Sequence, residues 1–158
     1  MSSSKPPSAK VKLLIRRPAA EVFAALTRPE QLTKFWLSSA SAPLEAGKTV
    51  HWEFKVQGST VDCNVRELVP SSRILIDWSD GTKLTFQLES RADGFTVLAV
   101  ENSGFGGSAA EALETALEAT QGFAIVVCNL KTLLERGESA GLVEDKALLI
   151  SEALRRQR

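Results

Sequence analysis

The chain has 158 residues, of which 44% are hydrophobic and 24% charged, a composition typical of one globular domain and not of a disordered or membrane-embedded protein. Its 19 basic residues balance 19 acidic ones, so no overall positive field favours nucleic acid or anionic lipid. The cysteines, Cys63 and Cys128, form no metal or redox motif and are interpreted as small buried residues of a cytoplasmic protein. We expect no metal, no cofactor and no nucleic-acid partner.

The first third of the chain predicts a tail, a strand and two short helices. Residues 1–9 are polar, and they lack the apolar run of a signal sequence or membrane span, which predicts a flexible tail. The β-branched run Lys10–Ile15 predicts a strand, and proline-initiated helical patterns predict helices over Pro18–Thr27 and Pro29–Phe35. The Ser/Ala/Pro/Gly stretch Ser38–Gly47 is interpreted as a loop.

The middle of the chain alternates apolar and polar residues with a period of two, which is typical of strands with one buried face. The predicted strands are Thr49–Val56, Val61–Pro70, Ile74–Trp78, Leu84–Leu88 and Phe95–Asn102. Asp80-Gly81 and Asp93-Gly94 are hairpin signals between neighbouring strands. These five strands with short turns predict an antiparallel meander in an α+β fold.

The last third predicts a long helix and one further helix. Ser108 and Glu111 have the spacing of a capping box, and Gly137 suits a left-handed helix end. The apolar stripe expected to face the sheet is Leu113, Leu117, Phe123, Val127, Leu130 and Leu134. A second stripe, formed by Val143, Ala147, Ile150 and Leu154, predicts a helix that either caps the domain or forms half of a homodimer contact.

The order of these elements resembles the helix-grip domains of the START and SRPBCC superfamily, and the motifs are similar to those of the activator of heat-shock protein 90 ATPase homologue family. The segments that carry the resemblance are Arg16–Phe23, Leu32–Trp36, Val65–Pro70, the Asp-Gly turn before Thr96, Asn102–Phe105, and Gly122–Phe123 through Leu133–Leu134. The resemblance implies a helix-grip domain over residues 10–137, with a curved sheet wrapped around the long helix. Residues 138–158 are expected to add one further helix beyond it.

An apolar pocket between the sheet and the long helix follows from this fold, although a filled core is the alternative. The aromatic residues expected to line the pocket are Trp36, Trp52, Phe54, Trp78, Phe86 and Phe123. The candidate polar anchors are Glu67, Thr96 and Asn102. Period-two counting puts Glu67 on the inner face, whereas a bulge near Pro70, or an ion pair with Arg66 or Arg73, would turn it to solvent.

His51, the only histidine, falls on the strand face opposite the pocket aromatics, so we assign no catalytic residue. The expected function is non-catalytic binding of a small apolar molecule, such as a lipid, polyketide or aromatic metabolite, in a regulatory or stress-related protein. Two alternatives stay open. One is a heat-shock chaperone ATPase regulator that acts through its surface, and the other is a cyclase-like enzyme that uses Glu67 and Asn102.

Overall fold

The computed structural model describes residues 5–157, which form a seven-stranded antiparallel sheet and four helices. The strands are β1 (Ala9–Ile15), β2 (Leu37–Ala40), β3 (Thr49–Phe54), β4 (Thr60–Val69), β5 (Arg73–Trp78), β6 (Lys83–Ser90) and β7 (Thr96–Ser103). The helices are α1 (Ala19–Thr27), α2 (Pro29–Phe35), α3 (Ala109–Arg136) and α4 (Leu142–Arg156). Of the predicted tail, residues 1–4 lie outside the described part, and Ala9 already belongs to β1.

The predicted meander is confirmed, because the sheet order β1-β7-β6-β5-β4-β3-β2 keeps β3 to β7 as consecutive neighbours. β1 closes one edge by pairing with β7, and β2 forms the other edge by pairing with β3. The interpretation of Ser38–Gly47 as a loop was wrong at its start, where Ser38 to Ala40 belong to β2. This strand has only four residues, two of them serine, so it shows no alternating pattern in the sequence. Its pairing with β3 is what makes it a strand.

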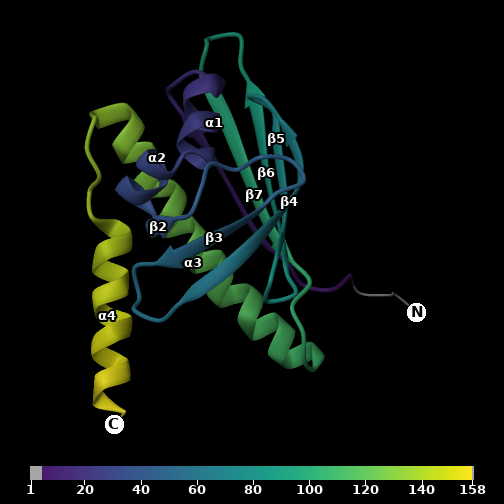
Figure 1. Cartoon of the computed structure of the whole chain (residues 1–158), viewed down its shortest axis with the longest axis vertical. Helices are drawn as coiled ribbons and strands as arrows, with labels where there is room; N and C mark the ends of the chain where they lie inside the picture. Colours follow the sequence, from purple (N-terminus) through teal and green to yellow (C-terminus); the bar gives the residue numbers. More distant parts are fainter. Residues whose placement is uncertain (1–4, 158) are drawn as a thin grey trace.

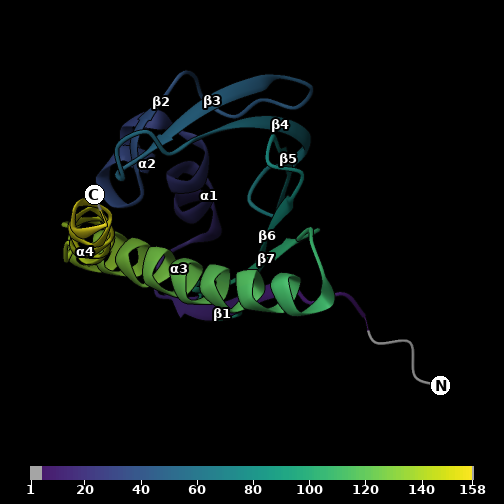
Figure 2. The same cartoon turned by 90° about the horizontal axis from the view of Figure 1, so that it is seen from below.

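The sheet is strongly curved, as Figure 2 shows, with α1 and α2 inside the curve and α3 across its open side. The same arrangement in Figure 1 brings the turn between β3 and β4 close to α4. The inward side chains of the strands and helices form one buried cluster that includes Trp52, Phe86 and Leu130. This is the helix-grip architecture that the element order predicts.

Helix α3 begins and ends as its sequence predicts. The Ser108 hydroxyl accepts a hydrogen bond from the Glu111 backbone N–H at 3.1 Å, the Glu111 carboxylate accepts one from the Ser108 backbone N–H at 3.2 Å, and Gly137 ends the helix with φ 86°. The predicted inner stripe was wrong in the first turns, because Leu113 and Leu117 are 52% and 64% exposed. The residues that face inward there are Ala112 and Ala116. Because neighbouring positions of a helix point in different directions, Leu113 and Leu117 lie on the surface when Ala112 and Ala116 face inward.

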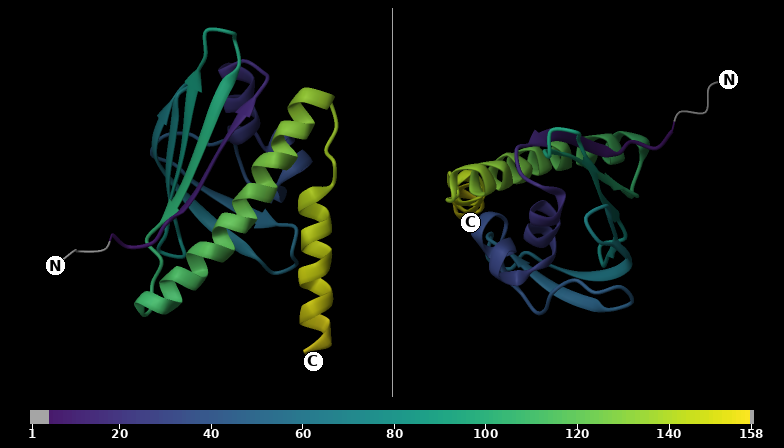
Figure 3. Two further views of the ribbon diagram at one scale, coloured as in Figure 1. Left: turned by 180° about the vertical axis from the view of Figure 1, so that it is seen from behind. Right: turned by 90° about the horizontal axis from the view of Figure 1, so that it is seen from above.

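Helix α4 follows a short connection after α3 and runs back along it at an angle, so that the two helices diverge (Figure 3). Val143 and Ala147 pack toward the domain, while Leu148, Leu149 and Leu154 are exposed. Of the stripe predicted for this segment, Val143 and Ala147 therefore cover part of the domain, whereas Ile150 and Leu154 are exposed. Within residues 5–157, no helix combines the length and the apolar character needed to cross a membrane.

The buried Asn129 of α3 connects three elements through its amide group. Its Nδ2 donates to the carbonyl oxygen of Phe35, at the end of α2, at 2.9 Å. Its Oδ1 accepts hydrogen bonds from Ser139 Oγ at 2.9 Å and from the backbone N–H of Leu142 at 3.2 Å. A buried amide that satisfies groups on neighbouring elements fixes their relative positions. Asn129 thus holds both the end of α2 and the start of α4 against α3.

Cys63 lies in the middle of the sheet, paired with Val50 on β3 and with Trp78 on β5. Its burial raises the pKa of its thiol to about 12, because the thiolate would lose its hydration. Cys128, in contrast, is exposed on α3. The expectation that both cysteines are buried therefore holds for Cys63 only.

Replacing Asn129 by Ala should lower the free energy of unfolding by about 2–4 kcal/mol, because several hydrogen bonds are lost and their buried partners stay unpaired. Urea unfolding measures this loss, and hydrogen exchange should show faster exchange in α4. The exposed Asn64, which accepts a hydrogen bond from Thr49 at 2.6 Å, supplies the control Asn64→Ala, with an expected change below about 0.5 kcal/mol. Equal losses in the two variants would contradict this role of Asn129.

The raised pKa of Cys63 predicts how stability depends on pH. The protonated thiol favours the folded state, so this contribution is complete below the ordinary pKa of 9.0 and is lost as the pH rises toward about 12. Urea unfolding between pH 8 and pH 11 should therefore show a smaller loss of stability in Cys63→Ala than in the wild type, with Cys128→Ala as the control. At pH 8 a thiol reagent should modify Cys128 in the folded protein and leave Cys63 intact. Modification of both thiols at equal rates would refute the assignment.

Candidate functional site

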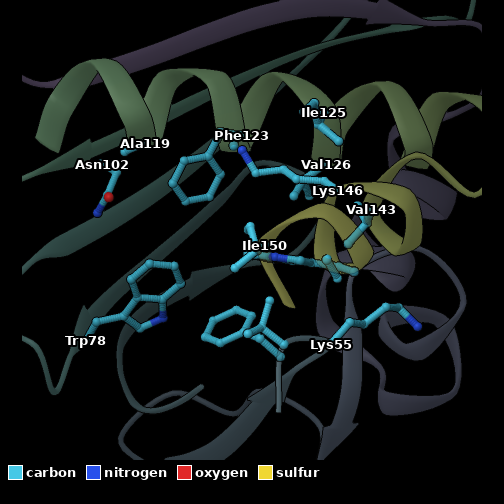
Figure 4. A pocket seen from close by; sticks show the side chains of 15 residues that line it. Lys55, Trp78, Asn102, Ala119, Phe123, Ile125, Val126, Val143, Lys146 and Ile150 are labelled. Carbon is cyan, nitrogen blue, oxygen red and sulfur yellow. The ribbon is translucent and has the colours of Figure 1, made fainter. Parts of the chain in front are cut away.

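A pocket of about 290 Å³ lies between the β3–β4 turn, α3 and α4. Figure 4 shows it from close by, with side chains from α3 and α4 on one side and Trp78 and Lys55 on the other. The residues that line it are Trp36, Phe54, Lys55, Val56, Trp78, Asn102, Ala119, Gly122, Phe123, Ile125, Val126, Val143, Lys146, Ala147 and Ile150. Apolar side chains form most of this surface, which is typical of small-molecule sites.

Trp36 is the centre of the aromatic cluster beside the pocket. It directly follows α2 and closes that helix by a hydrogen bond from its backbone N–H to the Leu32 carbonyl oxygen at 3.0 Å. Its ring contacts six aromatic rings at centroid distances from 5.1 to 6.4 Å. Edge-to-face and tilted contacts of this kind each contribute about 0.5–1.5 kcal/mol beyond burial. The wall that Trp36 provides is therefore rigid.

Four of the six predicted aromatic residues line the pocket: Trp36, Phe54, Trp78 and Phe123. Trp78 and Phe123 stack at 6.1 Å with 20° between their planes. The expectation for Trp52 and Phe86 was wrong, because both are fully buried in the core and neither reaches the pocket. Trp36 packs against both rings edge-on, at 5.1 Å and 6.2 Å, and covers them.

The predicted polar anchors separate in the structure, and only Asn102 lines the pocket. Its Nδ2 donates to the Lys83 carbonyl oxygen at 2.9 Å. Thr96 is buried elsewhere and donates to the Arg17 carbonyl oxygen at 2.7 Å, so it holds the connection between β1 and α1. Thr96 therefore does not lie in the pocket, where it was expected as a polar anchor.

Glu67 does not point inward, which corrects the period-two count. A bulge shifts the register between Val65 and Glu67, so Leu68 packs against the core in the place that Glu67 was expected to take. The Glu67 carboxylate lies 3.6 Å from Arg73 Nε and is partly exposed. The alternative of a bulge and an ion pair with Arg73 therefore describes this residue. One extra residue in a strand reverses the faces of all that follow.

Two lysines are the charged residues of the lining, and neither was predicted. Lys55 Nζ lies 3.9 Å from Glu144 Oε2 and donates to the Thr33 carbonyl oxygen at 3.4 Å. Lys146 Nζ donates to Gln121 Oε1 at 3.4 Å. Lys146 shares the helical stripe of Val143 and Ile150, at spacings of three and four residues. That spacing was the signal available in the sequence.

His51 lies outside the pocket, on the outer face of the sheet, and its Nδ1 is 2.7 Å from Asp62 Oδ1. Among residues 5–157, no three His, Cys, Asp or Glu side chains gather to hold a metal ion. The pocket lining contains no carboxylate, imidazole, hydroxyl or thiol group. Its surface can hold an apolar molecule and present an amide and two ammonium groups to it.

Solved structures with the same fold include a protein from Staphylococcus saprophyticus, SSP2350. It is 25% identical, with a TM-score of 0.73 over 84% of this chain and 94% of that one. The Aha1 dimer from Colwellia psychrerythraea is 22% identical, with a TM-score of 0.72 over 84% of this chain and 98% of that one. DynU16, a putative protein in the dynemicin biosynthetic locus, is 25% identical, with a TM-score of 0.74 over 85% of this chain but 49% of its own. No curated protein matches the sequence.

The sequence also matches a family profile described as "Activator of Hsp90 ATPase homolog 1-like protein" over residues 16–135. The match extends from the end of β1 to the last turn of α3 and covers more than half of the chain. Helix α4 lies outside the matched residues. The chain therefore belongs to the family of Activator of Hsp90 ATPase homolog 1-like proteins.

Proposed function

We propose that this protein binds a small apolar molecule in the pocket between α3, α4 and the β3–β4 turn, and that it does so without catalysing a reaction. The observation that carries the proposal is an apolar pocket of about 290 Å³ beside a preformed aromatic cluster. A 150 Å³ cavity lined by apolar side chains holds one benzene molecule, so this pocket has room for about two rings or a medium-length acyl chain.

The surroundings of the pocket favour binding over reaction. General acid–base chemistry needs a group that exchanges protons near neutral pH, and the lining offers none of the usual carboxylate or imidazole groups. Glu67, one of two residues that a cyclase-like enzyme was expected to use, lies outside the pocket. One structural relative belongs to a biosynthetic locus, which supports a small organic molecule as the ligand. A regulatory or stress-related role in the cytoplasm stays part of this proposal.

Filling the pocket from α3 should abolish binding. Gly122 lines the pocket, and a Cβ added at this position meets no atom within 4 Å. Gly122→Leu should therefore place a side chain in the pocket and stabilise the helix by about 0.5–1 kcal/mol, since glycine is a poor helix former. We expect the affinity for 1-decanol and for 2-naphthalenemethanol to fall by more than about tenfold, measured by calorimetry. Tryptophan fluorescence should follow decanol binding, because Trp36 and Trp78 line the pocket.

Ala110→Leu is the matched control for this variant, because Ala110 is exposed on the same helix and outside the pocket. It should bind both alcohols as the wild type does. If neither alcohol binds to the wild type, or if Gly122→Leu binds them unchanged, the pocket is not the binding site.

A second candidate function is regulation of a chaperone ATPase through the protein surface. Membership of the family supports it, and so does the exposure of Leu113 and Leu117, which lie one turn apart on α3. Exposed apolar side chains at such a spacing are typical of helix faces that contact a partner.

The two candidate functions predict opposite results in an ATPase assay with the cognate heat-shock chaperone. A surface regulator should lose its effect when Leu113 and Leu117 are both changed to Gln, and it should keep the effect in Gly122→Leu. An unchanged ATPase rate in the presence of the wild-type protein would remove this candidate.

A further inference from the structure

The charged side chains that line the pocket have one sign. Both charged residues of the lining, Lys55 and Lys146, are basic, and no acidic side chain lines it. In an apolar surrounding with low dielectric, an ammonium group attracts an anion more strongly than it does in bulk water. The charge of the lining therefore favours ligands that carry negative charge.

The two lysines differ in how their charges are compensated. Lys55 lies near the Glu144 carboxylate, at 3.9 Å, and donates to a backbone carbonyl oxygen. Lys146 contacts the neutral amide of Gln121, and no carboxylate of residues 5–157 lies within ion-pair distance of it. An ammonium group has three N–H donors, so Lys146 keeps donors for another acceptor. It is the uncompensated charge beside the pocket.

The position of Lys146 suits an anion that stays partly hydrated. Figure 4 shows its side chain extending from α4 toward α3, beside Phe123. The residue is half-buried, since its stem covers apolar surface while its polar end remains near water. A carboxylate at this place would pair with the ammonium without full burial, which avoids most of the cost of removing an ion from water.

We propose that the pocket prefers an apolar monocarboxylate, whose hydrocarbon part lies against Trp78, Phe123 and Ile150 and whose carboxylate pairs with Lys146. This inference rests on the proposed function and adds the ligand class to it. Two sources share this chemistry, an aromatic acid of about two rings and a medium-length fatty acid. Because α4 lies outside the residues that match the family, the lysine is a feature of this chain and not of the matched region.

Calorimetry with ligands of equal skeleton and different charge tests the proposal. In the aromatic arm we expect 2-naphthoate to bind about 3- to 10-fold more tightly than 2-naphthalenemethanol, as for a partly exposed charge pair. In the aliphatic arm we expect decanoate to bind more tightly than 1-decanol by a similar factor. Whichever of the two acids binds more tightly indicates whether the ligand is an aromatic acid or a fatty acid. The preference should decrease in 1 M NaCl, because salt screens exposed charges.

Substitutions of Lys146 test whether this lysine causes the preference for acids. Lys146→Met should remove the preference for the acids over the alcohols, whereas Lys146→Glu should reverse it in favour of 2-naphthylmethylammonium. Lys34→Met is the control, since Lys34 is exposed on α2 and lies outside the pocket. Circular dichroism and thermal unfolding confirm that each variant is folded.

The possible results separate the proposed function from the inference. If acids and alcohols bind the wild type equally well, the pocket binds apolar molecules and the anion preference is refuted. If Lys55→Met removes the preference and Lys146→Met does not, the assignment to Lys146 is overturned. If neither class binds, both the proposed function and this inference fail.

Discussion

The amide of Asn129 is the interaction on which the geometry of the pocket depends. It is buried in α3 and pairs with the carbonyl oxygen of Phe35 on one side and with the first residues of α4 on the other. The next residue after Phe35 is Trp36, the centre of the aromatic cluster. A single side chain thus sets the distance between two opposite walls, and an apolar residue there would leave buried polar groups of the backbone unpaired.

The pocket exists because α4 does not lie flat against α3. The two helices are held together at the start of α4 and diverge along it, so Val143 and Ala147 pack closely while Ile150 borders open space. The large rings beside this gap do not fill it, since Trp36, Trp78 and Phe123 already hold each other in tilted, edge-on and stacked contacts. Rigid aromatic contacts on one side and a diverging helix on the other leave a void of ligand size.

The matched region and α4 supply different parts of the pocket. Residues 16–135 supply strands β2 to β7 of the curved sheet, the aromatic cluster and nearly all of α3. Helix α4 supplies the remaining wall and the lysine at its edge. Under the proposed function, a change in the segment after α3 would alter the ligand preference, because that segment carries Lys146 and the apolar side chains of one wall, whereas Lys55 belongs to the matched region.

Much of the fold was determined by local patterns in the sequence. The alternation from Val50 to Val65 defines which strand face is buried, Ser108 and Gly137 define the ends of α3, and the two Asp-Gly turns define the meander. These signals act between residues that are close in sequence, so they are readable without the fold. Of the six aromatic residues expected in the pocket, four line it: the strand alternation indicated Phe54 and Trp78, and the helical patterns and the family resemblance indicated Trp36 and Phe123.

The rest depended on contacts between distant segments. The short β2 exists because β3 pairs with it, and the bulge before Glu67 turns that residue outward although its position in the alternation favours the inner face. Trp52 and Phe86 have the same pattern as the pocket residues, but Trp36 covers them from another element. Which inward residues border the pocket also depends on the positions of α2 and α4, and both are held against α3 by the buried amide of Asn129, whose partners the strand and helix patterns do not reveal.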